Sequence, residues 1–269
     1  MNILLIGGGF MGEALLAGIL NSEHANDLDM TVAELNEERQ NYLRNTYPIT
    51  VTKSALNALQ DNSPDLIILS VKPQQFSQTV QPFKGLINSS TLVISVAAGI
   101  PLTTVTEKTG QPLSARIMPN LPAAVMEGAA AIYFAPEFTR QQKNIVINLI
   151  KTSCPTLVEV DSDDKVDLCT AINGSGPAYI FQIIEAMISA ATLRGMAETD
   201  AKALVLQTVL GAAKYAQGSD NSIQDLRAAV TSPGGTTAAG LAILQSADVN
   251  ITFDSAIAAA YARAIELRT

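Results

Sequence analysis

Residues 1–161 alternate between short, nearly continuous apolar runs and longer stretches with helical periodicity. The first run, residues 2–6, has the pattern of a strand buried on both faces of a sheet. Runs of the same kind predict strands at residues 30–33, 66–71, 92–96, 115–118, 129–134 and 156–160. Helices are expected between them, at residues 11–20, 37–45, 56–60, 75–82, 101–109 and 139–152. This alternation predicts an α/β domain with a parallel-rich sheet.

The pattern changes after residue 161. Strand-like runs end there and alanine, the strongest helix former, becomes frequent. Successive helices are expected at residues 177–194, 200–217, 222–230, 237–245 and 251–267, separated by glycine, proline and polar positions. We therefore expect an α/β domain at residues 1–161 and an all-α domain at residues 162–269.

Composition places the chain among globular proteins. Of its 269 residues 48% are hydrophobic and 16% are charged, which excludes an intrinsically disordered chain. Seventeen basic and twenty-five acidic residues give a net charge of −8, which argues against nucleic acid or an anionic membrane as a partner. No apolar run reaches the ~20 residues of a membrane span, and the N-terminus is a poor signal peptide. These features predict a cytoplasmic protein.

The chain is poor in residues that bind metals or act as general bases. Cys154 and Cys169 lie fifteen residues apart with no histidine nearby, so neither a disulfide framework nor a zinc site is expected. His24 is the only histidine and lies in a polar stretch away from every motif. We therefore expect no metal, no Ser-His-Asp or Cys-His triad, and no His-dependent dehydrogenase.

A glycine cluster directly follows the first predicted strand and leads into a helix. Residues 7–12 read Gly-Gly-Gly-Phe-Met-Gly and fit the pattern G-x-G-x-x-G. In this strand–turn–helix context the pattern is typical of dinucleotide binding. The glycines allow a tight turn, and the N-terminus of the helix offers unpaired N–H groups to a pyrophosphate.

Two interpretations of the dinucleotide remain open at the end of the second predicted strand. Glu34 lies 22 residues beyond Gly12, where a carboxylate would bind the ribose hydroxyls of NAD and repel the 2′-phosphate of NADP. Asn36 and Arg39 follow it. Arg39 can instead pair with that phosphate, or be a solvated surface charge.

The ends of three further predicted strands carry loop residues. They are Ser70-Val71-Lys72-Pro73, Ala97-Ala98-Gly99 and Pro119-Asn120. Because ligands of open parallel sheets bind beyond the carboxyl ends of the strands, these segments are candidates for a cofactor rim.

Two glycine-rich segments stand at expected helix starts in the second half. Residues 173–179 predict one start, with Ser175 as its cap and Pro177 in its first turn. Residues 231–237 predict another, in which Gly234, Gly235 and the threonines leave N–H and hydroxyl donors free. These donors suit a carboxylate, although the segment would also fit a plain helix–helix corner.

Together these motifs resemble the pyrroline-5-carboxylate reductases, which catalyse the last step of proline biosynthesis. The resemblance spans residues 6 to about 245 and rests on the segments 6–12, 71–73, 95–100, 116–120, 174–179 and 230–237, in the family's order. Two residues depart from the family pattern: Leu121 replaces a usual threonine, and Asn173 replaces a common serine. These changes affect local contacts.

The resemblance implies a Rossmann-like domain followed by a helical domain that interlocks with a second subunit, in dimers that often form rings of five. It implies an active site where the cofactor domain meets the helical domains of a dimer. The implied cofactor residues are Gly7, Gly8, Gly9, Phe10 and Met11 for the pyrophosphate, and Ser70, Val71, Lys72, Ala97, Ala98, Gly99, Met118, Pro119 and Asn120 around the ribose and nicotinamide.

For the substrate, the resemblance implies a carboxylate site at Gly234, Gly235, Thr236 and Thr237, with the Thr237 hydroxyl facing the ring nitrogen. A hydride would pass from the nicotinamide to C5 of the cyclic imine, a good electrophile once protonated, so little acid–base machinery is required. Family habit favours NADP(H), with NAD(H) as the alternative, whereas Glu34 favours NAD(H).

Two other functions compete with this one. A β-hydroxyacid dehydrogenase shares the layout but needs a lysine on the first helix of its second domain, and residues 177–194 contain none. A non-catalytic dinucleotide sensor would keep the Gly7–Gly12 loop without needing the carboxylate site. Turnover of cofactor with a cyclic imine separates these possibilities.

Overall fold

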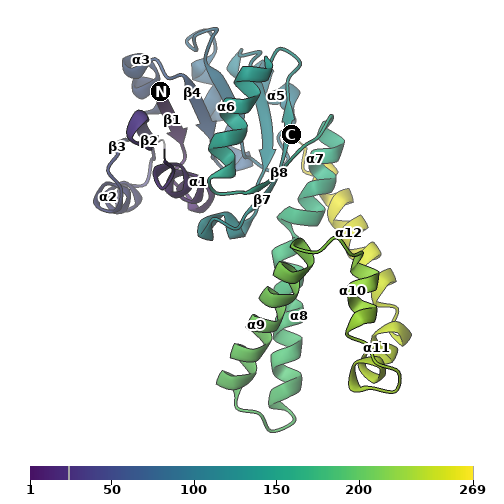
Figure 1. The fold of residues 1–269 in the computed structure, drawn as a ribbon. Helices are drawn as coiled ribbons and strands as arrows, with labels where there is room; N and C mark the ends of the chain where they lie inside the picture. The colour runs from purple at the N-terminus through teal and green to yellow at the C-terminus, as the bar shows by residue number, and fades with distance from the viewer. Residues whose placement is uncertain (24, 269) are drawn as a thin grey trace. The chain divides into compact units, whose positions relative to one another are not determined.

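The computed structural model describes residues 1–23 and 25–268 (Figure 1). His24 lies outside the described residues. Compactness divides the chain into one unit formed by Met1–Ser175 with Ala260–Thr269, and a second formed by Gly176–Ala259. The sequence places the domain boundary at residue 161, before the division at residue 175. The segment after residue 161 packs on the sheet and therefore belongs to the first compact unit. The domain boundary itself stays a prediction.

The first unit is built on a twisted, mostly parallel sheet with the strand order β3-β2-β1-β4-β5-β6-β7-β8. The strands are β1 (Asn2–Ile6), β2 (Asp29–Ala33), β3 (Thr50–Thr52), β4 (Leu66–Leu69), β5 (Leu92–Ser95), β6 (Ser114–Met118), β7 (Ala129–Phe134) and β8 (Thr156–Glu159). All neighbours pair in parallel except β6 and β7, which are antiparallel. The order β3-β2-β1-β4-β5-β6 is the dinucleotide-binding arrangement, and it confirms the predicted Rossmann-like domain.

Helices cover both faces of this sheet (Figure 1). They are α1 (Phe10–Leu20), α2 (Glu37–Thr46), α3 (Ala55–Asn62), α4 (Pro73–Val80), α5 (Leu102–Thr109) and α6 (Arg140–Lys151). Side chains alternate along β1, so Leu5 packs with Leu16 and Ile150 in one core, while Leu4 packs with Phe76 in the other. Burial on both faces explains the continuous apolar runs of the strands.

A helix does begin within residues 173–179, as predicted, but Ser175 is not its cap. The helical segment begins earlier, at α7 (Asp163–Cys169), where the Ser162 side chain accepts a hydrogen bond from the Lys165 backbone N–H. It continues through a π-helical turn, η4 (Thr170–Gly174), into α8 (Gly176–Thr192), and Ser175 itself has helical dihedral angles. The wider turn bonds the Ser175 N–H to the Thr170 carbonyl. It thereby accommodates Pro177, which lacks an N–H and would disturb a regular helix.

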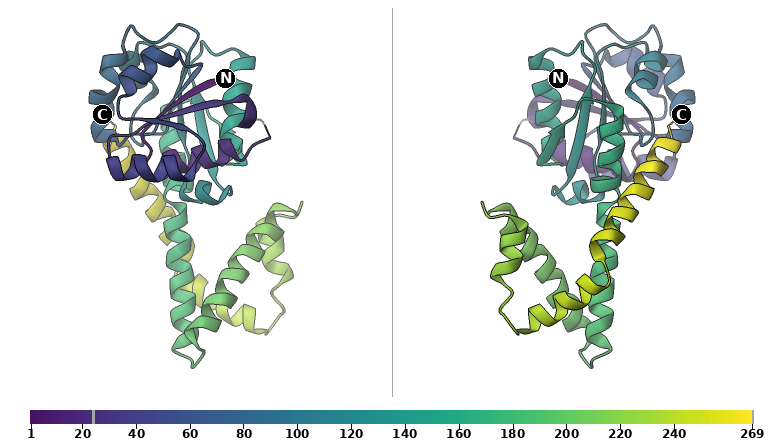
Figure 2. Two further views of the ribbon diagram at one scale, coloured as in Figure 1. Left: turned by 90° about the vertical axis from the view of Figure 1, so that its left-hand side faces the viewer. Right: turned by 90° about the vertical axis from the view of Figure 1, so that its right-hand side faces the viewer.

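The second unit is entirely helical. Its elements are the whole of α8, then α9 (Glu198–Gln217), α10 (Ile223–Ala229), α11 (Thr236–Ser246) and the first part of α12 (Val249–Glu266). Helices α8 and α9 form a hairpin and contact each other, and they diverge with distance from their connecting turn (Figure 2). The all-α second region expected from the sequence is confirmed.

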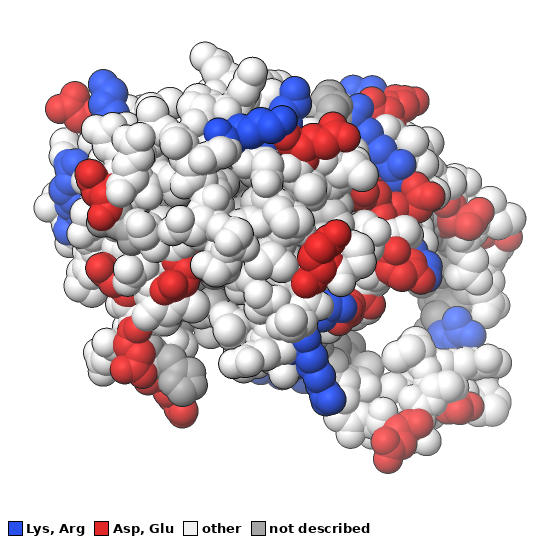
Figure 3. All heavy atoms as spheres, turned by 90° about the horizontal axis from the view of Figure 1, so that it is seen from above, with Lys and Arg blue, Asp and Glu red and all other residues white. Residues whose placement is uncertain are grey.

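Charges of both signs are interspersed over the face shown in Figure 3, in keeping with the mildly acidic composition. Cys154 and Cys169 are free thiols, and burial raises the pKa of Cys154 to about 11. Within the described residues, no helix combines the length and apolarity needed to cross a bilayer. The same residues contain no cluster of three metal-ligating side chains.

Candidate functional site

The glycine turn between β1 and α1 is shaped by close backbone approach. Gly7 has a φ of +97°, and a Cβ added there would lie 2.4 Å from the Ser70 carbonyl oxygen. A Cβ on Gly12 would lie 2.1 Å from the Gly7 carbonyl oxygen. Gly9 caps α1 without a side-chain bond, so the first N–H groups of the helix face outward from a turn that only glycine can form. This geometry fits the pyrophosphate of a dinucleotide.

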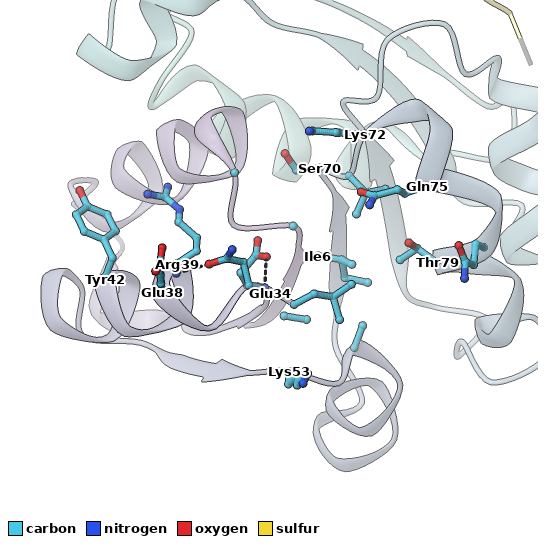
Figure 4. Close-up of a pocket in the computed structure, with 18 residues that line it drawn as sticks. Ile6, Glu34, Glu38, Arg39, Tyr42, Lys53, Ser70, Lys72, Gln75 and Thr79 are labelled. Atoms are coloured by element: carbon cyan, nitrogen blue, oxygen red, sulfur yellow. Dashed lines mark hydrogen bonds between the residues drawn. The ribbon is translucent and has the colours of Figure 1, made fainter.

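A pocket of about 1000 Å³ opens beside this turn, at the carboxyl ends of β1, β2, β3 and β4 (Figure 4). Its lining combines residues from the glycine turn, the end of β2, the start of α2 and the loop after β4. The lining residues are Ile6, Gly7, Gly9, Ala33, Glu34, Leu35, Asn36, Glu38, Arg39, Tyr42, Lys53, Ala55, Ser70, Val71, Lys72, Gln75, Gln78 and Thr79. The pocket therefore lies at the point where strand order reverses, between β1 and β4, which is where such sheets bind ligands.

Glu34 is held to the backbone on both sides of its carboxylate. Its Oε2 accepts a hydrogen bond from the Gly8 N–H at 2.9 Å, and its Oε1 accepts one from the Asn36 N–H at 2.8 Å. The Asn36 side chain in turn caps α2 by accepting from the Arg39 N–H. The carboxylate thus faces the pocket while tying the end of β2 to the glycine turn.

Arg39 is occupied by contacts within the protein. Its Nε donates to the Gly8 carbonyl oxygen at 2.6 Å, its guanidinium forms an ion pair with Glu13, and its Cζ lies 4.8 Å from the centre of the Tyr42 ring. These three contacts hold the guanidinium between α1 and α2. Arg39 is therefore not the solvated surface charge that was one interpretation of the sequence.

Glu13 organises this corner and was missed by sequence reasoning. Besides Arg39, it accepts hydrogen bonds from the hydroxyls of Tyr42 and Tyr47, each at 2.9 Å. Burial acts to raise the pKa of Glu13, but the bonds from Arg39, Tyr47 and Tyr42 outweigh it, and the pKa falls below its usual value. Burial and the bond to Glu13 raise the pKa of Tyr47 to about 12. Glu13 is therefore an anion at neutral pH.

Two lysines also line the pocket, and they are more exposed to solvent than Arg39. Lys53 follows β3 directly and is exposed, and Lys72 is exposed at the start of α4. Figure 4 places Lys53 and Lys72 at two sides of the pocket. Sequence reasoning anticipated Lys72 but not Lys53, because the short strand before Lys53 was not predicted.

The predicted cofactor residues divide into two groups in the structure. Gly7, Gly9, Glu34, Asn36, Arg39, Ser70, Val71 and Lys72 line the pocket, with the backbone of Gly8 bonded to its wall. The other predicted residues are outside the pocket lining, namely Phe10, Met11, Pro73, Ala97, Ala98, Gly99, Met118, Pro119 and Asn120. Their role toward a cofactor stays a prediction.

The loops after β5 and β6 are held by contacts of their own. Gly99 has a φ of +73°, and a Cβ there would lie 2.7 Å from the Leu267 carbonyl oxygen. The Asn173 side chain donates to the carbonyls of Met118 and Ala129 at 3.1 and 2.9 Å. Asn173, one of the two departures from the family pattern, therefore ties the π-helical turn to the end of β6.

The proposed carboxylate loop begins α11 in the second unit. Gly234 has a φ of +71°, and Gly235 caps the helix in an extended conformation without a side-chain bond. The first N–H groups of α11, at Thr236 and Thr237, are thus free of a capping side chain. This is the local geometry that a carboxylate requires, and the assignment of these four residues to substrate stays a prediction.

Comparison with known proteins assigns the family. A family model of pyrroline-5-carboxylate reductase dimerisation matches residues 163–267, and one of coenzyme F420-dependent NADP oxidoreductases matches residues 2–99. A pyrroline-5-carboxylate reductase of Methanosarcina acetivorans is 35% identical over 97% of this chain and 96% of its own length. One from Synechocystis is 34% identical over 98% and 97%.

Solved structures agree with this result. A pyrroline-5-carboxylate reductase from Coxiella burnetii superposes with a TM-score of 0.92 at 31% identity, covering 100% of this chain and 98% of its own. The Plasmodium falciparum pyrroline carboxylate reductase with NADP bound has a TM-score of 0.87 at 27% identity, with the same coverage. The expected resemblance is confirmed, and the chain belongs to the family of pyrroline-5-carboxylate reductases, which are nicotinamide-dependent oxidoreductases.

Proposed function

We propose that this chain reduces 1-pyrroline-5-carboxylate to L-proline, the last step of proline biosynthesis. The observation that carries the proposal is the glycine turn of β1 and α1, which opens on a pocket of about 1000 Å³ at the strand-order reversal. The turn admits no Cβ at Gly7 or Gly12 and presents helix N–H groups, so it fits a dinucleotide pyrophosphate. Full-length similarity to named reductases supports the choice of substrate.

The cofactor residues of this chain have distinct tasks. Residues Gly7 to Met11 hold the pyrophosphate, and Ser70, Val71, Lys72 and Pro73 line the neighbouring ribose. The loops Ala97–Gly99 and Met118–Asn120, at the ends of β5 and β6, flank the nicotinamide. When bound, the nicotinamide supplies the hydride. The rigid contacts of these loops, such as Asn173 on the Met118 carbonyl, keep the reacting faces oriented.

The substrate residues lie at the start of α11. The N–H groups of Gly234, Thr236 and Thr237 bind the carboxylate of the imine, helped by the positive end of the helix. Gly235 completes this substrate loop and shapes its turn, since its N–H donates to the Ser232 carbonyl at 3.0 Å. The Thr237 hydroxyl contacts the ring nitrogen and is the catalytic residue. Because a protonated imine is already electrophilic, the residues mainly position it and exclude water.

NADP(H) is the favoured cofactor, with NAD(H) as the alternative. Three cationic side chains line the pocket, Arg39, Lys53 and Lys72, against the carboxylates of Glu34 and Glu38. The Glu34 carboxylate already accepts two backbone N–H groups, which offset part of its repulsion toward a phosphate. The NADP named in the Plasmodium falciparum structure supports the same choice.

The protein acts as a homodimer through its helical domain, and five dimers form a ring. The match of residues 163–267 to a dimerisation model supports the dimer. The enzyme works in the cytoplasm, where reduced nicotinamide cofactors are supplied.

The test is absorbance of reduced nicotinamide with purified protein and pyrroline-5-carboxylate, run once with NADPH and once with NADH. Oxidation that depends on the imine supports the reductase, and the ratio of the two rates reports the cofactor. A β-hydroxyacid dehydrogenase would instead reduce NADP⁺ or NAD⁺ with a hydroxyacid. Binding of either cofactor without oxidation in any of these mixtures would favour a dinucleotide sensor.

A further inference from the structure

Two cations stand at the part of the pocket where the sequence places a 2′-phosphate, and the structure treats them differently. Glu34 marks the position of the ribose hydroxyls at the end of β2. Arg39 lies in the first turn of α2, and Lys53 follows β3. Sequence reasoning considered Arg39 alone. This inference rests on the proposed use of a nicotinamide dinucleotide.

Two of the three guanidinium nitrogens of Arg39 are committed inside the protein. Its Nε bonds the Gly8 carbonyl at 2.6 Å, its Nη2 pairs with Glu13, and its guanidinium lies over Tyr42. Glu13 is itself fixed by the hydroxyls of Tyr42 and Tyr47. Turning Arg39 toward a phosphate would break these contacts and leave Glu13, a partly buried carboxylate, without its cation.

Lys53 has no such commitment. Its side chain is exposed, lines the pocket, and has no hydrogen bond or ion pair with any residue that the structure describes. It is also well placed by the backbone, since the Glu34 N–H donates to the carbonyl of Thr52, the residue before Lys53. Figure 4 shows Lys53 across from Glu34 at the same pocket.

We propose that Lys53 is the residue that selects NADPH by binding its 2′-phosphate, and that Arg39 is a positioning residue for the glycine turn. An exposed ammonium ion binds a phosphate as a point charge, at the cost of the side-chain entropy that Lys53 loses when it becomes ordered. Arg39 acts through Gly8: the guanidinium on the Gly8 carbonyl and Glu34 on the Gly8 N–H hold the two successive peptide units that meet at this residue. Its loss therefore affects both dinucleotides alike.

Binding to the protein without substrate tests this assignment. The variants are Lys53→Gln and, as the matched comparison, Arg39→Gln, with Lys72→Gln as a control lysine at the same pocket. Calorimetric titrations use NADPH, NADH, 2′,5′-ADP and 5′-ADP. Lys53→Gln is expected to weaken NADPH and 2′,5′-ADP about tenfold and to leave NADH and 5′-ADP unchanged. Arg39→Gln is expected to weaken NADPH and NADH by a similar factor.

The opposite selectivity would overturn the proposal. If Arg39→Gln weakens 2′,5′-ADP but spares 5′-ADP, while Lys53→Gln changes neither, Arg39 is the phosphate ligand. An equal loss of preference for 2′,5′-ADP over 5′-ADP in Lys53→Gln and Lys72→Gln would also overturn it, since the effect would then be general charge. Failure of the reductase assay with intact binding of both dinucleotides would contradict the proposed function and leave the assignment of Lys53 standing.

Discussion

The two compact units bury their apolar side chains in opposite ways. In the first, both faces of the sheet are covered, and the strands contribute fully buried residues such as Leu5 and Ile68. In Gly176–Ala259, which the structure describes throughout, Ala201 and Val205 are the only buried apolar side chains. Large apolar residues are instead exposed along the helices, among them Phe181, Leu193, Leu204, Leu210, Ile243 and Phe253.

This difference separates two sources of stability. The first unit contains its own cores, whereas the second leaves many large apolar side chains exposed in the single chain. A second copy of the chain would cover such a surface, as the dimerisation model matched by residues 163–267 implies. Substitutions in the first unit should therefore change folding stability, and substitutions on the helices should change association.

The largest effect is expected from a buried ion-pair network in the first unit. The Arg116 side chain is 1% exposed and pairs with Asp163 and with the fully buried Asp167. Arg116→Met would leave Asp163 without a cation and Asp167 with Arg268 alone, so the free energy of unfolding should fall by about 3–5 kcal/mol. Urea unfolding followed by circular dichroism measures it.

An exposed ion pair of the same unit provides the control. Lys165 in α7 pairs with Asp161, which lies just before that helix, and both side chains are largely exposed. Lys165→Gln should change the free energy of unfolding by less than about 1 kcal/mol. A loss as large as that of Arg116→Met would show that burial does not decide the cost of breaking an ion pair in the first unit.

A charge on the helical surface should act on association instead. Phe181 on α8 is 54% exposed in the single chain. If a partner covers it, Phe181→Asp places a charge in a desolvated interface and should raise the dimer dissociation constant at least about thirtyfold. Sedimentation equilibrium measures this, with Lys202→Gln on α9 as the control. Unchanged association would remove Phe181 from the interface.

The same contrast explains how much of the fold the sequence predicts. The apolar runs of the first unit predict every strand of its sheet except one. The exception, Thr50–Thr52, is a three-residue edge strand that is not fully buried, so it carries no apolar run. Helix α7 was not predicted, because charged residues like those of its first turn are also typical of a junction between domains. In the structure, Asp163 and Asp167 of this helix form ion pairs with Arg116.

For the site, the motif residues were predictable and their partners were not. The spacing between the glycine turn and Glu34 along the chain is enough to predict both, because β1 and β2, which precede them, are neighbours in the sheet. Glu13, Tyr47 and Lys53 join the site through contacts between α1, α2 and the end of β3. No local pattern marks these contacts, because each depends on tertiary packing of elements that are distant in sequence.

A smaller effect is expected at the carboxylate loop of the second unit. Thr237→Val removes one hydroxyl while keeping the shape of the side chain. If that hydroxyl contacts the ring nitrogen, kcat with the imine should fall about tenfold, while calorimetric binding of NADPH is unchanged. Thr231→Val is the control, because the Thr231 hydroxyl already donates to the Arg227 carbonyl within the protein. Equal rates for wild type and Thr237→Val would exclude Thr237 from the reaction.

The smallest effect is expected at the cofactor pocket, where Glu34 and Lys53 act in opposite directions. Glu34→Gln removes the negative charge but keeps one oxygen, so one of the N–H groups of Gly8 and Asn36 loses its acceptor. That loss weakens both dinucleotides alike and cancels in their ratio. The removal of repulsion between Glu34 and the 2′-phosphate acts on NADPH alone and does not cancel. It should raise the preference for NADPH over NADH about fivefold.

Glu38→Gln makes this test specific to position. Glu38 lines the same pocket and carries the same charge, but it lies one residue before Arg39 in α2, away from the glycine turn. If the ratio of kcat/KM values for NADPH and NADH shifts equally in both variants, the net charge of the pocket decides the preference. A shift confined to Glu34→Gln means instead that cofactor choice depends on one carboxylate fixed by the backbone. The first unit would then control both its own stability and the identity of the reductant, leaving the helical unit to control association and the substrate.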